Sequence, residues 1–394
     1  MAEVRSRLAR LSCRACCTDV DPSRPVGCCP TCGHALLATY DLSDLDGEEW
    51  LRSVRGRPPT LWRYRELLPV QADASVVSLG EGYSPILDLG ARPQLPGIQL
   101  LVKDDGGLPT GSFKARGMAV AVARARELGI RELFVPSAGN AGVALAAYGA
   151  RAGLRVRVYL PARTPEAMIA ACRLYGAEVI PVEGTIREAG EHARRVEIGR
   201  GSFDMSTLRE PYRAEGKKTM GLEIFEQRRS EGMPDAIVYP TGGGTGLVGM
   251  YKAFQELGAL HLLREMPRLI AVQPEGCAPV VRALRANAAR AEPWESPSTA
   301  APGLLVPAPF SSERILEAIR GSGGTGTLVT DAQLLAAVGE LARDHGISAS
   351  PEGAAVYAAL PGLLRSGAIR PGERILLYNT GSGIPFLNER SPAT

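Results

Sequence analysis

Apolar and polar positions follow two alternating periods from about residue 98 onward. Short apolar runs predict buried strands, and between them apolar residues recur every three or four positions, as they do in helices. The first run is expected to contain strands at 98–103, 132–136, 155–160 and 178–182 and helices at 115–128, 141–152 and 165–175. A second run is expected to contain a strand at 236–240, a helix at 247–257 and a strand at 268–273. Such alternation is typical of parallel sheets covered by helices on both faces.

The composition predicts a large, ordinary globular protein. Of 394 residues, 45% are hydrophobic and 22% are charged, which indicates neither disorder nor a membrane span. The 45 Lys and Arg residues are scattered among 42 Asp and Glu residues, so we expect no basic face and neither a nucleic-acid nor a membrane partner. The amino terminus lacks an apolar core followed by a small-residue cleavage site, and we therefore expect a cytoplasmic protein.

Six of the eight cysteines lie within the first 32 residues. Two Cys-x-x-Cys pairs can each present two sulfurs to one tetrahedral ion, which predicts a closed structural zinc site. Its expected ligands are Cys13, Cys16, Cys29 and Cys32. Vacant or partly oxidised thiols are the alternative, and three nearby donors keep other ligand sets open: Cys17, Cys28 and His34. The polar residues 41–49 and the Pro-rich residues 57–59 predict a linker after this segment.

A glycine-rich loop, Thr241–Gly246, joins the expected strand at 236–240 to the following helix. Backbone amides in such a loop can converge on an anion at the helix N-terminus, which predicts phosphate binding. Gly244-x-Gly246-x-x-Gly249 also matches the dinucleotide fingerprint, and Glu275 follows the next strand, so a nicotinamide cofactor stays open at this point. No Lys-Ser or Lys-Thr pair follows the glycines, which excludes a nucleoside-triphosphate loop.

Lys114 lies on a glycine-flanked turn where a helix is expected to begin. A lysine near the positive end of a helix dipole loses its proton more easily and can form a Schiff base with an aldehyde cofactor. The alternative is an exposed lysine at an ordinary capped helix start.

Two further turns follow expected strands. In Ser137–Gly142, the backbone amides and the Ser137 hydroxyl could hold a carboxylate, and Asn140 could donate to a ring oxygen or simply cap the helix. The strand at 375–378 ends in Asn379–Gly383, whose hydroxyls face the ligand crevice if the turn is more than a polar loop.

A lysine, a phosphate loop, a carboxylate turn and a neutral hydroxyl for a ring nitrogen are the parts that pyridoxal phosphate needs to act on an amino acid. With them the chain resembles the fold-type II pyridoxal-phosphate enzymes and, within these, the threonine synthase family. The resemblance covers nearly the whole chain, from the cysteine segment to the motifs at 78–82, 111–117, 210–219, 241–246 and 380–383.

The resemblance implies an α/β fold like that of the tryptophan synthase β subunit: two doubly wound α/β domains plus a small N-terminal zinc ribbon. It implies a zinc-ribbon-like segment at 1–40, a large cofactor-binding domain at 41–117 and 213–394, and a small α/β domain at 118–212. It also implies a homodimer acting on a small amino-acid substrate.

The resemblance further implies residue roles. Lys114 corresponds to the Schiff-base lysine. Phe113 and Asn140 would neighbour the cofactor ring, and Thr380 would face its nitrogen. The phosphate would be held by Gly242, Gly243, Gly244, Thr245 and Gly246, and the substrate by Ser137, Ala138, Gly139 and Arg213.

The family reaction eliminates phosphate from O-phosphohomoserine and adds water to give threonine. Several positions depart from the family pattern: Leu108, Ala115, Thr207, Leu208, Glu210, Ile384 and Pro385. Leu208 donates no hydrogen bond, and a carboxylate at Glu210 would oppose a substrate phosphate. The chain is therefore expected to be a divergent threonine synthase, or else an enzyme of β-elimination or β-replacement on another amino acid, such as a serine or threonine dehydratase. A regulatory protein with an inactive enzyme body is the third hypothesis, which the intact Lys114 disfavours.

Overall fold

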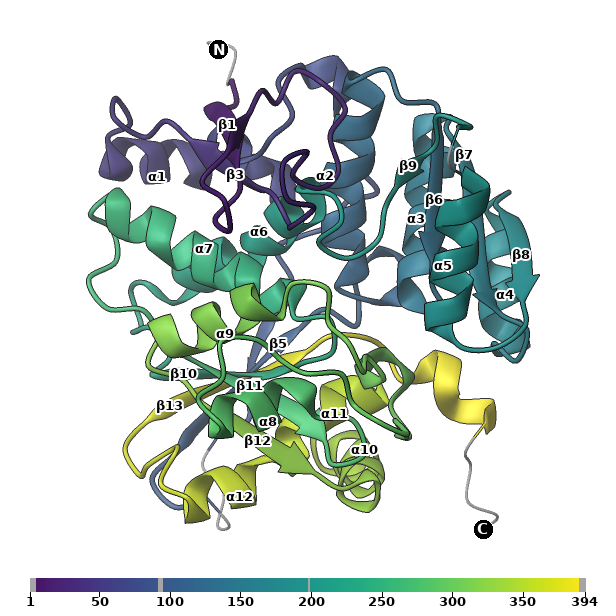
Figure 1. Ribbon diagram of the computed structural model, residues 1–394. Helices are drawn as coiled ribbons and strands as arrows, with labels where there is room; N and C mark the ends of the chain where they lie inside the picture. Colours follow the sequence, from purple (N-terminus) through teal and green to yellow (C-terminus); the bar gives the residue numbers. More distant parts are fainter. Residues whose placement is uncertain (1–4, 91–94, 198, 390–394) are drawn as a thin grey trace. The chain divides into compact units, whose positions relative to one another are not determined.

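The computed structural model describes residues 5–90, 95–197 and 199–389, so the first four residues of the amino-terminal segment lie outside it. The chain divides into two compact units (Figure 1). Unit 1 comprises Met1–Tyr83, Lys114–Thr219 and Ala259–Leu262. Unit 2 comprises Ser84–Phe113, Met220–Gly258 and Leu263–Thr394. The domain boundaries expected from the sequence stay a prediction.

Unit 1 begins with a small antiparallel sheet in the order β2-β1-β3. Its strands are β1 (Leu8–Ser12), β2 (Asp19–Val20) and β3 (Leu37–Tyr40). Helix α1 (Gly47–Arg55) then occupies the middle of the stretch predicted as a linker, so that prediction is wrong there. Asp46 caps the helix by accepting the Glu49 N–H at 2.8 Å, and the helix buries Trp50, Leu51 and Val54. A polar sequence here reflects a surface helix with one apolar side.

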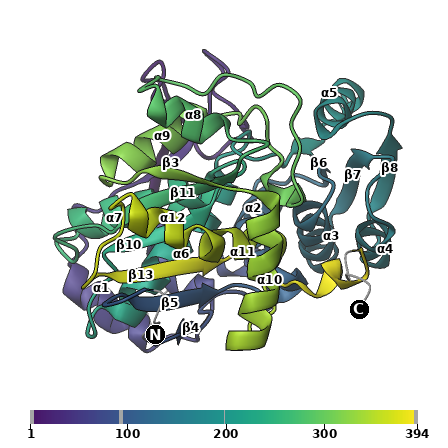
Figure 2. The same ribbon diagram turned by 90° about the horizontal axis from the view of Figure 1, so that it is seen from below.

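The second sheet of unit 1 has four parallel strands in the order β8-β7-β6-β9. The strands are β6 (Glu132–Pro136), β7 (Arg155–Pro161), β8 (Glu178–Val182) and β9 (Phe203–Asp204). Helix α5 (Ile186–Glu197) covers one face, and helices α3 (Asn140–Ala152) and α4 (Glu166–Leu174) cover the other (Figure 2). The unit also contains α2 (Lys114–Glu127) and the first half of α6 (Tyr212–Arg228).

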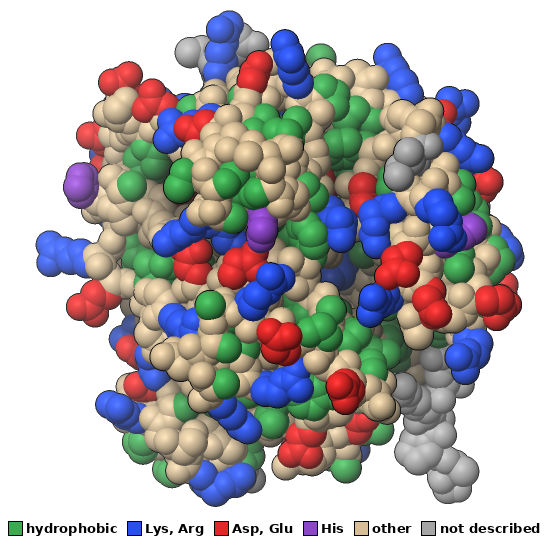
Figure 3. Space-filling view, viewed as in Figure 1, with side chains coloured by type: hydrophobic (Ala, Val, Ile, Leu, Met, Phe, Trp, Pro, Cys, Tyr) green, Lys and Arg blue, Asp and Glu red, His purple; other side chains and the backbone are tan. Residues whose placement is uncertain are grey.

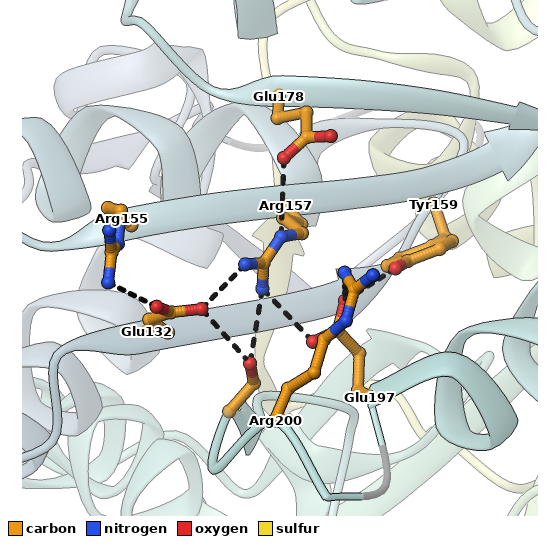
Figure 4. A network of polar contacts seen from close by, with 8 residues as sticks. Glu132, Arg155, Arg157, Tyr159, Glu178, Glu197 and Arg200 are labelled. Carbon is orange, nitrogen blue, oxygen red and sulfur yellow. Dashed lines mark hydrogen bonds and ion pairs between the residues drawn. The ribbon is translucent and has the colours of Figure 1, made fainter.

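Polar side chains bridge the strands of this second sheet around Arg157 (Figure 4). Its guanidinium lies 2.6 Å from Glu132, 3.0 Å from Glu197 and 3.2 Å from Glu178. Tyr159 donates its hydroxyl to Glu197, whose side chain is only 1% exposed. Buried charges of this kind are tolerated because each is paired and hydrogen-bonded.

Unit 2 is built on a six-stranded sheet in the order β12-β11-β10-β13-β5-β4, in which only β4 runs antiparallel. The strands are β4 (Ile86–Asp88), β5 (Gln99–Asp104), β10 (Ala236–Pro240), β11 (Arg268–Pro274), β12 (Gly326–Val329) and β13 (Arg374–Asn379). The main core lies between the central strands and helices α10 (Asp331–His345), α11 (Pro351–Ala358) and α12 (Leu360–Arg365). Helices α8 (Pro279–Arg285) and α9 (Ser312–Gly321) also pack against β11, and α7 (Thr245–Ala259) follows β10. The predicted alternation of strands and helices is confirmed.

No helix in the described residues combines the length and the apolar character needed to cross a membrane. On the face drawn in Figure 3, positive and negative side chains are interspersed and do not gather by sign.

Candidate active site

The residues predicted for the site divide between the two units. Unit 2 contains Phe113, Gly242, Gly243, Gly244, Thr245, Gly246 and Thr380. Unit 1 contains Lys114, Ser137, Ala138, Gly139, Asn140, Arg213 and the cysteine segment.

In unit 2, the predicted residues gather at one edge of the sheet. Strands β10 and β13 are parallel neighbours, so the loop after Pro240 and the turn after Asn379 emerge at the same edge. The segment before Lys114 joins them, because Ser112 bridges to Gly381 and the Phe113 N–H donates to the Thr380 carbonyl at 2.9 Å. This edge thus combines the predicted phosphate loop, the predicted ring-nitrogen partner and Phe113.

A chain of aromatic rings lies behind this edge. Tyr239, near the end of β10, has its ring centroid 6.2 Å from that of Phe113 and 5.5 Å from that of Tyr378, both edge-on. The Tyr378 hydroxyl donates to Asp105 at 2.9 Å, and the Ser84 hydroxyl donates to the same carboxylate at 2.6 Å. The sequence analysis missed Asp105 and Tyr239. The signal for Asp105 was its place directly after strand β5, at the carboxyl edge where ligands bind.

Packing requires glycine at three places in the loop after β10. A Cβ atom on Gly242 would lie 2.5 Å from the Gly303 carbonyl oxygen, and one on Gly246 would lie 2.1 Å from the Tyr239 hydroxyl oxygen. Gly244 has φ +66°, and a Cβ atom there would lie 2.3 Å from Ile315. The glycines therefore have a structural reason independent of any anion.

The same loop also fits a phosphate group. In the part of the chain that the structure describes, no protein hydrogen bond uses the N–H groups of Gly242, Gly243 or Gly244. These donors stand directly before α7, a helix of 15 residues whose first N–H groups have no partner within the helix. Unpaired donors at the positive end of a helix dipole match the phosphate of pyridoxal phosphate.

The turn before Lys114 is strained and carries unsatisfied hydroxyls. Thr110 has φ +62°, an unusual value for a β-branched residue. Among the described residues, the Thr110 and Ser112 hydroxyl oxygens are buried without a hydrogen-bond partner. Strain and orphaned polar atoms of this kind concentrate at functional sites.

In unit 1, Lys114 is the first residue of α2, as the sequence predicts for a helix start. The sequence has five lysines: Lys103, Lys114, Lys217, Lys218 and Lys252. Three of them form ion pairs with glutamates: Lys103 with Glu223, Lys218 with Glu215, and Lys252 with Glu256. Lys217 lies inside α6, so Lys114 is the one lysine of the sequence placed at the positive end of a helix dipole.

The turn Ser137–Asn140 leads from β6 into α3. The Ser137 hydroxyl oxygen accepts the N–H of Gly139 at 3.3 Å and that of Gly142 at 3.1 Å. Ser137 therefore satisfies the start of α3, and the predicted alternative of a cap by Asn140 is wrong, because Asn140 is already the first residue of the helix and Gly139 precedes it as the N-cap. Ser137, Ala138, Gly139 and Asn140 are all partly exposed.

Glu210 and Arg213 are buried at the start of α6. The Glu210 carboxylate accepts the N–H of Tyr212 at 2.7 Å and of Arg213 at 3.0 Å. This carboxylate serves as the cap of α6, which gives Glu210 a structural reason of its own, and its expected effect on a substrate phosphate stays a prediction. Burial raises the pKa of Glu210 to about 7 although Arg213 acts in the opposite direction, and burial also lowers the pKa of Arg213.

The Arg213 side chain is 3% exposed and only partly hydrogen-bonded. One terminal nitrogen donates to the Met205 carbonyl, and among the described residues the Nε atom has no partner. A buried guanidinium with an unused donor is a candidate anion contact. Lys218 is not such a contact, because it is paired with Glu215 at 2.8 Å and lies 3.9 Å from the centroid of the Tyr40 ring.

The structure brings four cysteine sulfurs together, all within 4.8 Å of one another: Cys13, Cys16, Cys29 and Cys32. The Cys13 and Cys32 sulfurs are 3.4 Å apart, and the Cys16 and Cys29 sulfurs are 3.5 Å apart. Sulfurs around one tetrahedral zinc ion stand about 3.8 Å apart, so this set fits the metal.

The other three donors lie outside the sulfur cluster. Cys17 is exposed, Cys28 donates to the Arg209 carbonyl at 3.6 Å, and the His34 Nδ1 atom lies 3.2 Å from the Cys32 carbonyl oxygen. Burial raises the pKa of the Cys28 thiol, which suits a buried hydrogen-bonding thiol.

Comparison with known proteins agrees with these features. The sequence model of the family described as pyridoxal-phosphate dependent enzyme matches residues 77–381. Threonine synthase from Methanosarcina acetivorans is 35% identical over 373 residues, covering 94% of this chain and 91% of that protein. Threonine synthase from Methanocaldococcus jannaschii is 35% identical over 355 residues, covering 90% of this chain and 87% of that protein.

Solved structures give the same fold. Threonine deaminase from T.th. is 25% identical with a TM-score of 0.65, covering 89% of this chain and all of that chain. Maize serine racemase has a TM-score of 0.66 at 18% identity, covering 85% of this chain and 93% of that chain. The chain belongs to the family of pyridoxal-phosphate-dependent enzymes, in the fold-type II group that includes the threonine synthases.

Proposed function

We propose that this enzyme converts O-phosphohomoserine and water into threonine and phosphate. Its relatives across almost the whole chain are named threonine synthase. The structural observation that carries the proposal is Arg213, a buried guanidinium with an unused Nε donor. An anionic group on the substrate satisfies that donor with a charge-assisted hydrogen bond, which is stronger than the bond that a neutral hydroxyl makes.

The proposal gives each predicted cofactor residue a separate contact. Gly242 to Gly246 bind the cofactor phosphate through backbone N–H groups at the start of α7. Thr380 and Phe113, which share a backbone hydrogen bond, lie at its ring nitrogen and its ring. Lys114 is the covalent anchor, and Asn140 donates to the ring oxygen. A hydroxyl partner at the ring nitrogen favours elimination over transamination, because it stabilises a fully protonated ring less than a carboxylate does.

Pyridoxal phosphate, when bound, supplies an electron sink that makes the Cα proton of the amino acid removable. Lys114 moves the protons at Cα and Cβ while the γ-phosphate leaves as inorganic phosphate. Arg213 binds the substrate phosphate, and the turn at Ser137, Ala138 and Gly139 binds its carboxylate. A proton then reaches Cγ, which becomes the methyl group, water adds at Cβ, and Cα regains its proton, so that the hydroxyl of threonine comes from water and its carbon skeleton from the substrate.

The second candidate is elimination or replacement at Cβ of an unphosphorylated amino acid. Leu208 favours it, because this residue lies in the segment before Arg213 and its side chain offers no hydrogen-bond donor. Leu208 is 1% exposed, and its backbone adopts a φ of +58°. This chemistry needs the same lysine and cofactor loops but no γ-phosphate site.

The proposal also includes structural zinc on Cys13, Cys16, Cys29 and Cys32, a homodimer, and a cytoplasmic location. Metal analysis of the purified protein tests the first, since four thiolates predict one zinc per chain. Light scattering of the purified protein tests the second, since a homodimer has twice the chain mass of 41.8 kDa.

The decisive experiment incubates the cofactor-loaded protein with O-phosphohomoserine, serine, threonine or O-acetylserine. Release of phosphate together with threonine supports the proposal. Turnover of an unphosphorylated substrate with no response to O-phosphohomoserine rejects it in favour of the second candidate. Lys114→Ala is expected to lose the cofactor absorbance of the bound lysine and all turnover, and Lys252→Ala, which removes an ion-paired lysine of α7, is the matched control.

A further inference from the structure

The cysteine segment packs against the residues that lead into α6. A Cβ atom on Gly27 would lie 2.8 Å from the Arg209 carbonyl oxygen, and the Cys28 thiol donates to the same oxygen at 3.6 Å. Both residues directly precede Cys29, which belongs to the sulfur cluster. The Pro22 carbonyl also accepts a hydrogen bond from Arg124 of α2 at 2.7 Å. The metal-binding segment therefore contacts the backbone one residue before Glu210, the cap of α6.

The last strand of the segment contacts α6 itself. The Tyr40 hydroxyl donates to Glu215 at 2.9 Å, and the Tyr40 ring lies 3.9 Å from the Lys218 nitrogen. Glu215 and Lys218 are both 0% exposed. The segment thus contacts the chain both before and after Arg213, first at Arg209 and then within α6.

Helix α6 is in turn packed against the start of α2. A Cβ atom on Gly216 would lie 2.1 Å from the Arg116 carbonyl oxygen, and Arg116 donates to the Thr219 hydroxyl at 3.1 Å. Arg116 is completely buried and lies two residues after Lys114. All these contacts lie within unit 1.

We propose that the cysteine segment 5–40, called here the ribbon, is a metal-dependent positioning element for Arg213. The inference rests on the proposed role of Arg213 as the contact for the substrate anion. The ribbon does not touch the substrate. It holds the backbone at Arg209 and the side chains at Glu215 and Lys218, and thereby fixes the guanidinium between them.

The ribbon depends on its metal because its own core is small, with Leu11 and Leu36 as its fully buried aliphatic side chains. Its three strands have five, two and four residues, and one ion held by four thiolates would join the two loops that carry the cysteines. Small domains of this kind unfold when the metal is removed. Loss of zinc therefore releases Gly27 and Cys28 from Arg209, and weakens the hold of Tyr40 on α6.

The test compares the full-length, cofactor-loaded protein before and after removal of zinc by a chelator, and again after zinc is restored. Hydrogen exchange of residues 204–219 is the readout that needs no turnover. We expect faster exchange there without zinc and recovery with zinc, while β10 and β13 stay protected. Unchanged exchange at 204–219 in protein shown by metal analysis to be zinc-free overturns the inference.

Kinetics supply the second readout. A positioning role predicts that zinc removal raises the KM for O-phosphohomoserine by roughly tenfold and changes kcat by less than about threefold, because a misplaced Arg213 loses binding of the anion. A roughly tenfold fall in kcat at unchanged KM contradicts the positioning role. If no O-phosphohomoserine is consumed even with zinc, the proposed function fails, while the exchange experiment still decides whether the ribbon orders residues 204–219.

Two variants separate positioning from general damage. Tyr40→Phe removes the hydrogen bond to Glu215 but keeps the ring near Lys218 and all four sulfurs, so it should retain zinc and show the same KM increase in weaker form. Cys17→Ser changes an exposed cysteine outside the sulfur cluster and is the control, with exchange, zinc content and KM unchanged. A Tyr40→Phe protein with normal exchange at 204–219 and normal KM counts against the inference.

Discussion

Replacing Arg157 with methionine should destabilise unit 1 while leaving its chemistry intact. Arg157 lies on β7 and joins carboxylates from three neighbouring elements: Glu132 on β6, Glu178 on β8 and Glu197 at the end of α5 (Figure 4). Its side chain is 14% exposed. Methionine fills a similar volume without the charge, so the change removes the ion pairs and little of the packing.

The magnitude follows from the exposure of each partner. Glu178 is 67% exposed, so its pair contributes between zero and about 1 kcal/mol, and Glu132 keeps its second partner, Arg155, when Arg157 is replaced. Glu197 is 1% exposed, and removing one partner of a buried pair costs about 3–5 kcal/mol. Because Tyr159 still donates to Glu197, the lower end of that range applies. We expect a loss of about 3 kcal/mol, which corresponds to a fall in Tm of roughly 6–12 °C.

Thermal unfolding followed by circular dichroism measures this loss. Arg155→Met is the matched control, because Arg155 lies on the same strand and pairs with the same Glu132 but is 76% exposed, so its Tm should change by about 4 °C at most. The double variant Arg157→Met/Glu197→Gln also removes the buried charge of Glu197 that Arg157→Met leaves without its partner, and it should recover part of the lost Tm. A Tm for Arg157→Met equal to that of Arg155→Met, or a double variant less stable than the single one, would refute the reasoning.

Three further predictions concern the cofactor loop, acid stability and the turn before Lys114. Gly246→Ala places a methyl group against the Tyr239 hydroxyl and should weaken cofactor binding at least about tenfold in an absorbance titration, whereas Gly258→Ala, whose methyl group would meet a carbonyl oxygen only at 3.8 Å, should bind normally. The hydrogen bond from Arg157 lowers the pKa of Glu132, so this carboxylate stabilises the fold at neutral pH and loses its contribution as the pH falls below about 4. Urea unfolding from pH 7 to pH 3 should therefore show a steeper loss of unfolding free energy in the unmodified protein than in Arg157→Met. Thr110→Gly relieves a positive φ and should keep or raise the Tm while lowering turnover if the strained turn serves the site, and a lower Tm would contradict the assignment of strain.

Much of the fold could be predicted because the pattern of a buried parallel strand is local. The expected strands at 132–136, 178–182 and 236–240 coincide with β6, β8 and β10. Helix α1 was missed although its signals are local, since Asp46 stands at a capping position and Trp50, Leu51 and Val54 recur at helical spacing. The helix is short and lies within a polar stretch that ends in prolines, and these features alone suggested a linker.

The candidate site could be predicted where backbone conformation demands a residue type, as in the glycine loop after β10. It could not be predicted where a side chain has two available uses. Glu210 reads equally well as a pocket carboxylate or as a helix cap, and only the hydrogen bonds to Tyr212 and Arg213 separate the two. Asp105 had only its place after a strand as a signal, and the contacts that Asp105 and Tyr239 make with distant segments cannot be read from spacing in the sequence.

The contact between Tyr40 and Glu215 joins residues that are 175 positions apart. Because a ribosome adds about 5–20 residues each second, the ribbon emerges roughly 10–35 s before the helix it packs against has been made. During that interval the ribbon lacks its contacts with α6, and a metal ion on the four cysteines, as proposed above, would be an important source of its order. If the ribbon holds zinc as proposed, zinc supply during synthesis therefore influences how much of the newly made chain reaches the docked form, even when the finished protein holds its metal tightly.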